Sequence, residues 1–324
     1  MQKLKVGILG SGYMAHKHFN NLKKSKIFEM KYLLVNNRNL SKKKEIADKF
    51  SLDLFTSESD FWKQEFDLAV ICTPNHLHYK NIKSAFKNNK HVLCEKPLVH
   101  SIKEINEIEK TAKDKNLIIS VGMNLRFRVQ YYKLKEMLKQ LGKIYSFRFD
   151  YSFDLVESIS SKSKKWWEFE PLENLFFLYS GGIHPLDLIQ WFFGLPSKVY
   201  AQSPEMKLGD IDLMKYHFSI IMGYENIVGE CRISAVTKGK NNFSIEIYGD
   251  KGAIIDNKLY INNAEKEIVL NQPKFDLIMQ YEDLYKSIRN NKQPMNNLHE
   301  AKKNTKLLNK IKESVLTKKE INIK

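Results

Sequence analysis

Apolar residues in the first 120 positions form short unbroken runs that alternate with segments of helical spacing. The runs read KVGILG, KYLLVN, DLAVIC, HVLC and LIISV and begin at residues 5, 31, 67, 91 and 117. Between the runs, apolar side chains recur three and four positions apart, as at Ile82, Ala85 and Phe86. Unbroken apolar strands that alternate with helices predict a parallel sheet covered by helices on both faces.

The pattern changes after about residue 122. The segment YSFRFDYSF, residues 145–153, alternates aromatic and polar side chains, which is typical of a strand with one polar face. More strands are expected at 216–223, 227–236 and 243–249, with short turns between them. Such a meander predicts a largely antiparallel sheet with one open face, through which the chain is expected to form a homodimer or homotetramer.

Two helix starts carry capping signals. Ser101 and Glu104 form an S-x-x-E pair, and Asn297 stands at the same spacing from Glu300. The polar side chain before each helix is expected to bind free N–H groups of the first turn. These signals predict one helix after residue 101 and a final helix after residue 297.

A glycine pattern joins the first strand to the first helix. Gly10, Gly12 and Ala15 give G-x-G-x-x-A directly after an apolar strand. Gly10 permits a tight turn, Gly12 lets the backbone approach a pyrophosphate, and Ala15 lets the helix pack close to the sheet. Tyr13 and Met14 lie in the first helical turn, whose N–H groups and positive dipole end favour phosphates. The pattern predicts a site for NAD or NADP.

These patterns predict an α/β chain, and its 324 residues suit two domains. Residues 1–121 are expected to form an N-terminal Rossmann domain that binds the dinucleotide. Residues 122–324 are expected to form an α+β domain for substrate binding and oligomerisation, with a largely antiparallel open-faced sheet. The C-terminal helix is expected to be able to pack back on the first domain.

The residues after the second strand bear on the choice between NAD and NADP. An acidic residue is expected there in NAD-binding proteins, but Asn37 occupies the position and Arg38 follows. Without a carboxylate to repel a 2′-phosphate, and with a guanidinium nearby, the pattern leans slightly to NADP. NAD stays open because Asn37 can also bond a ribose hydroxyl.

Polar residues also follow the third apolar run. Thr73, Pro74, Asn75 and His78 lie at the expected carboxyl edge of the sheet, where open α/β folds bind ligands. We expect these residues to contact the cofactor, and His78 to orient the loop. His76 and His78 are two positions apart, but no acidic or cysteine residue is suitably spaced, so no metal site is expected.

Composition narrows the function without deciding it. Lysine and arginine number 53 against 37 acidic residues, which gives a net charge of +16. The lysines are spread over the polar faces of predicted helices, which indicates a solvated surface and no nucleic-acid partner. Three cysteines without metal spacing, no secretory signal and no run of about 18 apolar residues predict a cytoplasmic protein with no membrane partner.

The segment HVLCEKPLVHS places Glu95, Lys96 and Pro97 directly after the fourth apolar run. Three further segments stand in register with it: GSG at 10–12, TPNHLH at 73–78 and GGIHPLDLIQWFFG at 181–194. With these motifs the chain resembles the Gfo/Idh/MocA family of nicotinamide-dependent oxidoreductases over essentially its whole length. The resemblance implies hydride transfer between nicotinamide C4 and a carbinol or carbonyl carbon of a sugar, cyclitol or sugar nucleotide.

The same resemblance implies roles for the site residues. Lys96 would contact the nicotinamide ribose and the substrate hydroxyl, Glu95 would line the nicotinamide site, and Pro97 would be a cis-proline. His184 would be the partner in proton transfer, and Asp187 would orient it or bind substrate. Burial and a nearby positive nicotinamide would both lower the pKa of Lys96 toward that of a proton shuttle. The active site is expected in a cleft between the domains.

One departure from the family pattern leaves the chemistry open. Dehydrogenases of the family commonly carry an aspartate four residues before the histidine, where this chain has Ser180. A nicotinamide-using glycosidase or eliminase, or a non-catalytic nucleotide sensor, therefore remains as an alternative. Trp167 is a candidate wall for the sugar or nicotinamide, with ordinary packing as its alternative role. Arg126 is a candidate contact for an anionic group of the substrate, with the same alternative.

Overall fold

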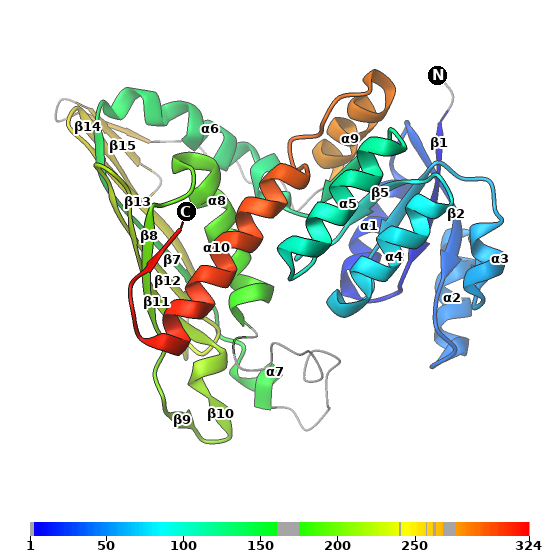
Figure 1. Cartoon of the computed structure of the whole chain (residues 1–324), viewed down its shortest axis with the longest axis horizontal. Helices are drawn as coiled ribbons and strands as arrows, with labels where there is room; N and C mark the ends of the chain where they lie inside the picture. Colours follow the sequence, from blue (N-terminus) through cyan, green and yellow to red (C-terminus); the bar gives the residue numbers. More distant parts are fainter. Residues whose placement is uncertain are drawn as a thin grey trace. The chain divides into compact units, whose positions relative to one another are not determined.

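The structure is a computed structural model that describes residues 3–160, 175, 177–239, 241–256, 258–261, 264–267 and 277–323 (Figure 1). The chain divides into two compact units. The first takes residues 1–127 and 273–302, and the second takes residues 128–272 and 303–324. The candidate residue Trp167 lies outside the described residues.

The first unit includes a segment from near the end of the chain, which the predicted boundary after residue 121 had placed in the second domain. The helix α9 (Ile278–Asn290) belongs to this first unit. Tyr281 and Leu284 on α9 join the hydrophobic core that also holds Phe19 and Phe28. The segment returns to the first unit because its apolar face is buried there.

The first unit is a doubly wound α/β domain, as the sequence predicted. Its six strands are parallel and lie in the order β3-β2-β1-β4-β5-β6. The strands are β1 (Leu4–Leu9), β2 (Phe28–Leu34), β3 (Asp53–Phe55), β4 (Leu68–Ile71), β5 (His91–Cys94) and β6 (Ile119–Val121). The helices besides α9 are α1 (Tyr13–Lys23), α2 (Leu40–Phe50), α3 (Glu58–Trp62), α4 (His78–Lys87) and α5 (Ile102–Asp114), with 3₁₀ turns η1 (Asn75–Leu77) and η2 (Asn124–Phe127).

The register of this sheet aligns the carboxyl ends of its strands. Leu34 pairs with Leu9, Leu9 with Ile71, Ile71 with Cys94, and Cys94 with Val121. Each of these residues is the last of its strand. The loops that follow β2, β1, β4, β5 and β6 therefore leave the sheet along one edge, with the change in chain direction between β1 and β4.

The second unit contains a nine-stranded sheet in the order β16-β15-β14-β13-β7-β12-β11-β8-β17. Only β7 and β12 pair in parallel among these strands, so the predicted largely antiparallel sheet is confirmed. The strands are β7 (Ile144–Ser152), β8 (Lys198–Gln202), β11 (His217–Gly223), β12 (Val228–Ser234), β13 (Asn242–Gly249), β14 (Gly252–Ile255), β15 (Lys258–Ile261), β16 (Ala264–Glu267) and β17 (Ile321–Asn322), with a separate hairpin of β9 (Lys207–Leu208) and β10 (Ile211–Asp212). The helices are α6 (Val129–Met137), the 3₁₀ turn η3 (Leu138–Leu141), α7 (Val156–Ser160), α8 (Ile183–Phe193) and α10 (Leu298–Thr317), which begins in the first unit.

One face of the nine-stranded sheet is covered by α8 and α10 (Figure 1). Phe147 of β7 stacks on Phe193 of α8 with ring centroids 4.3 Å apart, and Ser314 of α10 accepts the N–H of Ala201 at 2.9 Å. On the opposite face Ile221 and Val228 are 51% and 56% exposed. Association of copies through this open face stays a prediction.

The polar side of β7 is less exposed than its alternating pattern predicted. Asp150 and Ser152 point to the open face yet are 5% and 2% exposed. The carboxylate of Asp150 forms an ion pair with Arg232 of the neighbouring β12 and accepts the hydroxyl of Ser152. Burial without loss of hydrogen bonding explains why these polar side chains leave the solvent.

Both predicted capping residues begin helices. Asn297 precedes α10 and its Oδ1 accepts the N–H of Glu300 at 3.2 Å, as predicted. Ser101 precedes α5 without a side-chain cap bond, while the carboxylate of Glu104 accepts a backbone hydrogen bond from Ser101. Half of the predicted capping box is therefore formed.

Among the described residues, no helix has the length and apolar character needed to span a membrane.

Candidate functional site

The loop between β1 and α1 combines a required tight turn with open space. Gly10 has a φ of 103°, and a Cβ on it would lie 2.7 Å from the carbonyl oxygen of Cys72. Glycine is therefore needed for its conformation and for the close approach of the loop after β4. A Cβ on Gly12 would have no described atom within 4 Å. Gly12 precedes α1, which no described side chain caps, so the first N–H groups of α1 are available to an anion.

The two other predicted residues of this loop begin α1. Tyr13 is 74% exposed, and the ammonium of Lys17 lies 5.2 Å from its ring centroid. Met14 is partly buried. Behind them Ala15 is fully buried, as close packing of α1 on the sheet requires. Direct contact of Tyr13 and Met14 with a cofactor stays a prediction.

The segment after β2 brings together two cations and an amide. The Oδ1 of Asn36 accepts the backbone N–H of Arg38 at 3.1 Å. The ammonium of Lys43 donates to the backbone carbonyl of Asn36 at 2.7 Å and also to its Oδ1. Burial, and then the nearby Arg38, lower the pKa of Lys43. Asn37, the residue predicted to meet the ribose, is exposed at this edge. The arrangement gives this corner of the loop edge a positive charge.

His78 joins the loop after β4 to the turn after β5. Its Nδ1 lies 2.8 Å from the carbonyl oxygen of Pro97, and its Nε2 lies 2.9 Å from the carbonyl oxygen of Thr73. The ring is fully buried, and burial lowers its pKa. The expected role in orienting the loop fits this bridge. Thr73 is fixed further, because its Oγ1 accepts from Asn81 at 2.8 Å.

The Glu95–Lys96–Pro97 turn follows β5. The peptide bond between Lys96 and Pro97 is cis, so that prediction is confirmed. Glu95 is 5% exposed, and its Oε2 accepts the N–H of Lys96 at 3.3 Å. Burial lowers the pKa of Lys96, while the charge of Glu95 opposes that shift. The amine is therefore held where it can exchange a proton more readily than an exposed lysine.

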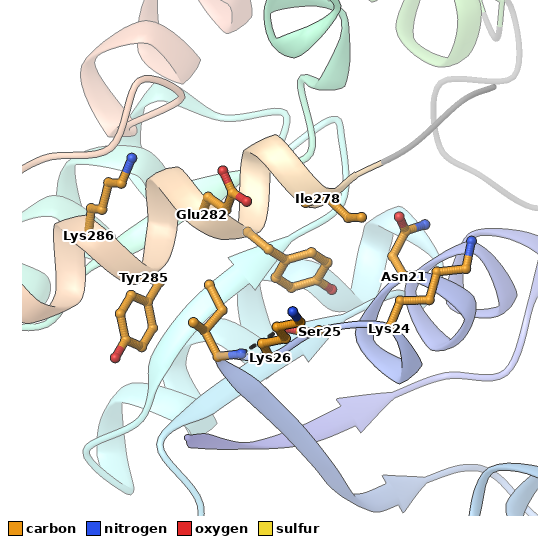
Figure 2. Close-up of a pocket in the computed structure, with 10 residues that line it drawn as sticks. Asn21, Lys24, Ser25, Lys26, Ile278, Glu282, Tyr285 and Lys286 are labelled. Carbon is orange, nitrogen blue, oxygen red and sulfur yellow. Dashed lines mark hydrogen bonds between the residues drawn. The ribbon is translucent and has the colours of Figure 1, made fainter. Parts of the chain in front are cut away.

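A hydrogen-bonded chain lies behind Glu95. His18 of α1 places its Nε2 3.0 Å from Oε1 of Glu95 and its Nδ1 2.6 Å from the hydroxyl of Tyr281 on α9. His18 is fully buried and Tyr281 is 3% exposed. Tyr281 also lines a hollow on the first unit, where Asn21 of α1 and Lys24, which follows α1, stand across from Glu282 of α9 (Figure 2). None of the described residues that line this hollow is a predicted cofactor or catalytic residue.

The second unit supplies the other predicted catalytic residue. His184 is the second residue of α8 and is partly buried, with its ring centroid 6.3 Å from that of Tyr151. Burial raises the pKa of Tyr151, so its hydroxyl keeps its proton. Asp187 is 1% exposed, and its Oδ1 accepts from Asn304 of α10 at 2.6 Å. Ser180 lies in a π-helical turn, Leu178–Gly182, that leads into α8.

Arg126, a predicted contact for an anionic substrate group, is buried. It is 1% exposed, and its Nη1 lies 2.8 Å from Oε2 of Glu300. The guanidinium is thus already neutralised by a carboxylate of the same unit. A role toward substrate stays a prediction for this residue.

Among the described residues, no group of three His, Cys, Asp or Glu side chains is placed to hold a metal ion.

Comparison with known proteins accounts for both units. Residues 4–123 match the model of an oxidoreductase family with an NAD-binding Rossmann fold, and residues 131–255 match the GFO/IDH/MocA C-terminal domain. The chain belongs to the Gfo/Idh/MocA family. It is accordingly an NAD(P)-dependent dehydrogenase or reductase.

This Gfo/Idh/MocA oxidoreductase has relatives in several bacteria. It is 25% identical over 304 residues to the oxidoreductase YrbE of Bacillus subtilis, which covers 88% of this chain and 84% of that protein. It is 27% identical over 296 residues to levoglucosan dehydrogenase of Pseudarthrobacter phenanthrenivorans. The matched region covers 79% of this chain and 74% of that protein. Among solved structures, myo-inositol 2-dehydrogenase from Lactobacillus plantarum has the same fold, with a TM-score of 0.84 at 19% identity over 100% of both chains.

Some residues of this Gfo/Idh/MocA site were not found from the sequence. Lys43 lies in a lysine-rich helix start, SKKK, and nothing in that run distinguishes it from its neighbours. His18 recurs with Ala15, Phe19 and Leu22 on the apolar face of α1, and that spacing is a signal that its ring is buried. Its partner Tyr281 comes from an element 263 residues away, which no local pattern reveals.

Proposed function

We propose that this chain transfers a hydride between nicotinamide C4 and a carbinol or carbonyl carbon of a sugar, cyclitol or sugar nucleotide, with Lys96 and His184 handling the proton. The observation that carries the proposal is the strand register of the first sheet. Leu9 pairs with Ile71, and Ile71 with Cys94. The glycine loop and the Glu95–Lys96–Pro97 turn therefore leave the sheet along the same edge.

The first unit fits NAD(P) by its own geometry. The open space over Gly12, beside the uncapped start of α1, matches the need of a pyrophosphate for close backbone N–H groups. Gly10, Gly12, Tyr13 and Met14 would hold the pyrophosphate side. The bound cofactor supplies or accepts the hydride at C4 of its nicotinamide. The loop residues Thr73, Pro74 and Asn75, with His78 behind them, would border it toward Lys96.

We favour NADP over NAD because the side chains after β2 carry positive charge. The ammonium of Lys43 bonds to Asn36, and the charge of Arg38 lowers the pKa of Lys43, so two cations lie close together beside the position where a 2′-phosphate would lie. Asn37 presents no carboxylate that would repel this phosphate. The second cation, Lys43, strengthens the slight lean that the sequence alone supported.

Lys96 is suited to work in both reaction directions. In oxidation its neutral amine would accept the proton of the substrate hydroxyl, and burial favours this neutral form by lowering its pKa. In reduction its ammonium would return a proton to the developing alkoxide. The neighbouring charge of Glu95 opposes the effect of burial, so both forms of Lys96 stay accessible.

His184 is proposed as the second group that handles the proton, with Asp187 as its support or as a substrate contact. Asp187 lies three residues after His184 on α8 and is fixed by Asn304. Ser180 stands where the family commonly has an aspartate, and a hydroxyl cannot stabilise an imidazolium by charge. We therefore assign the larger share of the proton transfer to Lys96.

A small carbohydrate-type substrate is supported by the relatives. Levoglucosan dehydrogenase, 27% identical to this chain, is named for an anhydrosugar. Sugars and cyclitols present the secondary hydroxyl that hydride transfer to nicotinamide requires. The open sheet face with Ile221 and Val228 supports the further proposal of a homodimer or homotetramer.

The test is a screen of polyols, anhydrosugars, sugars and sugar nucleotides with NAD, NADP and their reduced forms. The proposal expects the nicotinamide absorbance to change in proportion to product with at least one carbohydrate. Product that forms while the absorbance stays constant would favour the glycosidase or eliminase alternative. Tight NADP binding without any turnover would favour the sensor alternative.

A further inference from the structure

Glu95 is the end of a buried hydrogen-bonded chain that reaches through the first unit. Tyr281 Oη lies 2.6 Å from His18 Nδ1, and His18 Nε2 lies 3.0 Å from Glu95 Oε1. The side chains of His18 and Glu95 are 0% and 7% exposed. The three residues come from α9, α1 and the turn after β5. A chain of bonds without solvent contact holds one geometry more firmly than separate exposed bonds do.

The proton positions along this chain follow from the tyrosine. Burial raises the pKa of Tyr281 well above its usual range, so the phenol keeps its proton. With that proton directed to Nδ1 of His18, the ring proton would lie on Nε2. The Nε2–H then donates to Oε1 of Glu95. The tautomer of His18 with its proton on Nε2 thus satisfies both bonds.

Glu95 has no room to leave this arrangement. Its Oε2 accepts the N–H of Lys96 at 3.3 Å. On the β6 side, a Cβ on Gly122 would lie 2.9 Å from the carboxylate atoms, so only glycine leaves space there. Both oxygens are engaged, one by His18 and one by the backbone of Lys96. The carboxylate therefore connects the buried chain to the proposed catalytic lysine.

We propose that His18 and Tyr281 are positioning residues that hold the Glu95 carboxylate, and through it fix the Lys96 amine at the sheet edge. The proposal rests on the proposed role of Lys96. Besides Lys96 and His18, the titratable groups of the described residues that interact with the charge of Glu95 are Tyr281, His78, Cys72 and Cys94. Burial keeps Tyr281 and both thiols protonated and His78 neutral, so among these groups none replaces the charge of Glu95.

Loss of the Tyr281 hydroxyl has a defined consequence in this arrangement. His18 Nδ1 would lose its donor in a buried place, and the ring would lose the contact that fixes it from the α9 side. The ring could then turn, and its bond to Glu95 would weaken. A carboxylate that His18 holds less firmly would oppose the effect of burial on Lys96 less well, and a larger fraction of Lys96 would be neutral.

The test compares Tyr281→Phe with Tyr285→Phe in the full chain without added cofactor or substrate. Both rings pack against Phe28, at centroid distances of 5.4 and 5.8 Å, so the variants lose one hydroxyl each from the same helix and cluster. Competitive acylation with acetic anhydride, read by mass spectrometry, measures the reactivity of Lys96 relative to Lys43. Nitrogen-15 NMR of the His18 ring, assigned with His18→Gln, reads the tautomer.

We expect Lys96 in Tyr281→Phe to react about threefold faster at neutral pH, with the wild-type rate in Tyr285→Phe. We also expect Nε2 of His18 to carry the proton in the wild type, where it faces the Glu95 carboxylate. Unchanged Lys96 reactivity, or an Nδ1 proton in the wild type, would overturn the proposal. Neither readout needs turnover, so a catalytically normal Lys96→Met variant would refute the role of Lys96 without changing these results.

Discussion

The imidazole of His78 lies 2.8 Å from the carbonyl oxygen of Pro97 and 2.9 Å from that of Thr73, so one buried ring connects two loops of the candidate site. A neutral ring donates to one of the two carbonyls at a time. His78 therefore acts on the site through the positions of these loops.

We expect His78→Phe to lower the free energy of unfolding by about 1–3 kcal/mol, because a buried carbonyl loses its donor. Turnover should fall with it, since Pro97 follows Lys96 directly. Urea unfolding and steady-state rates measure the two effects. The control is His76→Ala, an exposed position on the same turn, which should change stability by less than about 0.5 kcal/mol. Equal stability of both variants would contradict the bridge.

The two glycines of the β1–α1 loop should respond differently to alanine. Gly10→Ala introduces a Cβ 2.7 Å from a carbonyl oxygen at a φ of 103°, so it should destabilise the fold. Gly12→Ala meets no described atom within 4 Å at a φ of −78°, so the unfolding temperature should hardly change. The methyl group would instead occupy the space proposed for the pyrophosphate and raise the Kd for NAD(P) about tenfold or more. Calorimetry and fluorescence titration separate the two outcomes, and normal NADP binding by Gly12→Ala would refute the assigned pyrophosphate position.

The cation pair at the end of β2 predicts cofactor preference. Arg38→Ala should raise the Kd for NADP about tenfold, because a charge-assisted contact to the 2′-phosphate is lost. The Kd for NAD should change by less than about twofold. Lys42→Ala is the matched control, since Lys42 is exposed beside Lys43 and has no bond to Asn36 among those found in the described residues. An equal loss of affinity for both cofactors would show that Arg38 contacts another part of the nucleotide.

The lowered pKa of Lys96 predicts that kcat/KM depends on pH in opposite ways in the two reaction directions. Oxidation needs the neutral amine, so kcat/KM for the alcohol should rise as pH increases through a pKa below the usual 10.5 of lysine. Reduction needs the ammonium, so kcat/KM for the carbonyl should fall over the same range. Profiles of kcat/KM against pH in both directions measure this. A kcat/KM that rises with pH in both directions, or falls in both, would exclude Lys96 as the group that exchanges the proton.

Much of this fold could be predicted because its strands are unbroken apolar runs and its helices keep regular spacing. Leu68–Ile71 is buried at every position, which is what a parallel sheet covered on both faces requires. The three-residue strand β3 and five-residue helix α3 are too short to carry such a pattern, and the sequence analysis did not find them. The burial of Asp150 was missed because its partner Arg232 lies on another strand.

The candidate site was likewise predictable where it depends on local sequence and not where it depends on distant residues. Glu95 and Lys96 could be placed at the sheet edge because they follow a recognisable strand directly. The partners of Glu95 could not, because His18 is 77 residues away and Tyr281 is 263 residues from His18. Local sequence patterns therefore identify where a catalytic residue leaves its strand, while the groups that set its position depend on tertiary packing.

The most direct test of the central claim is the turnover of Lys96→Met with a carbohydrate identified by the screen, measured beside NAD(P) binding. If Lys96 exchanges the proton with the substrate hydroxyl, turnover should fall by about 10²–10⁴-fold while the Kd for the cofactor stays within a few-fold of wild type. Turnover at the wild-type rate in Lys96→Met would contradict the account.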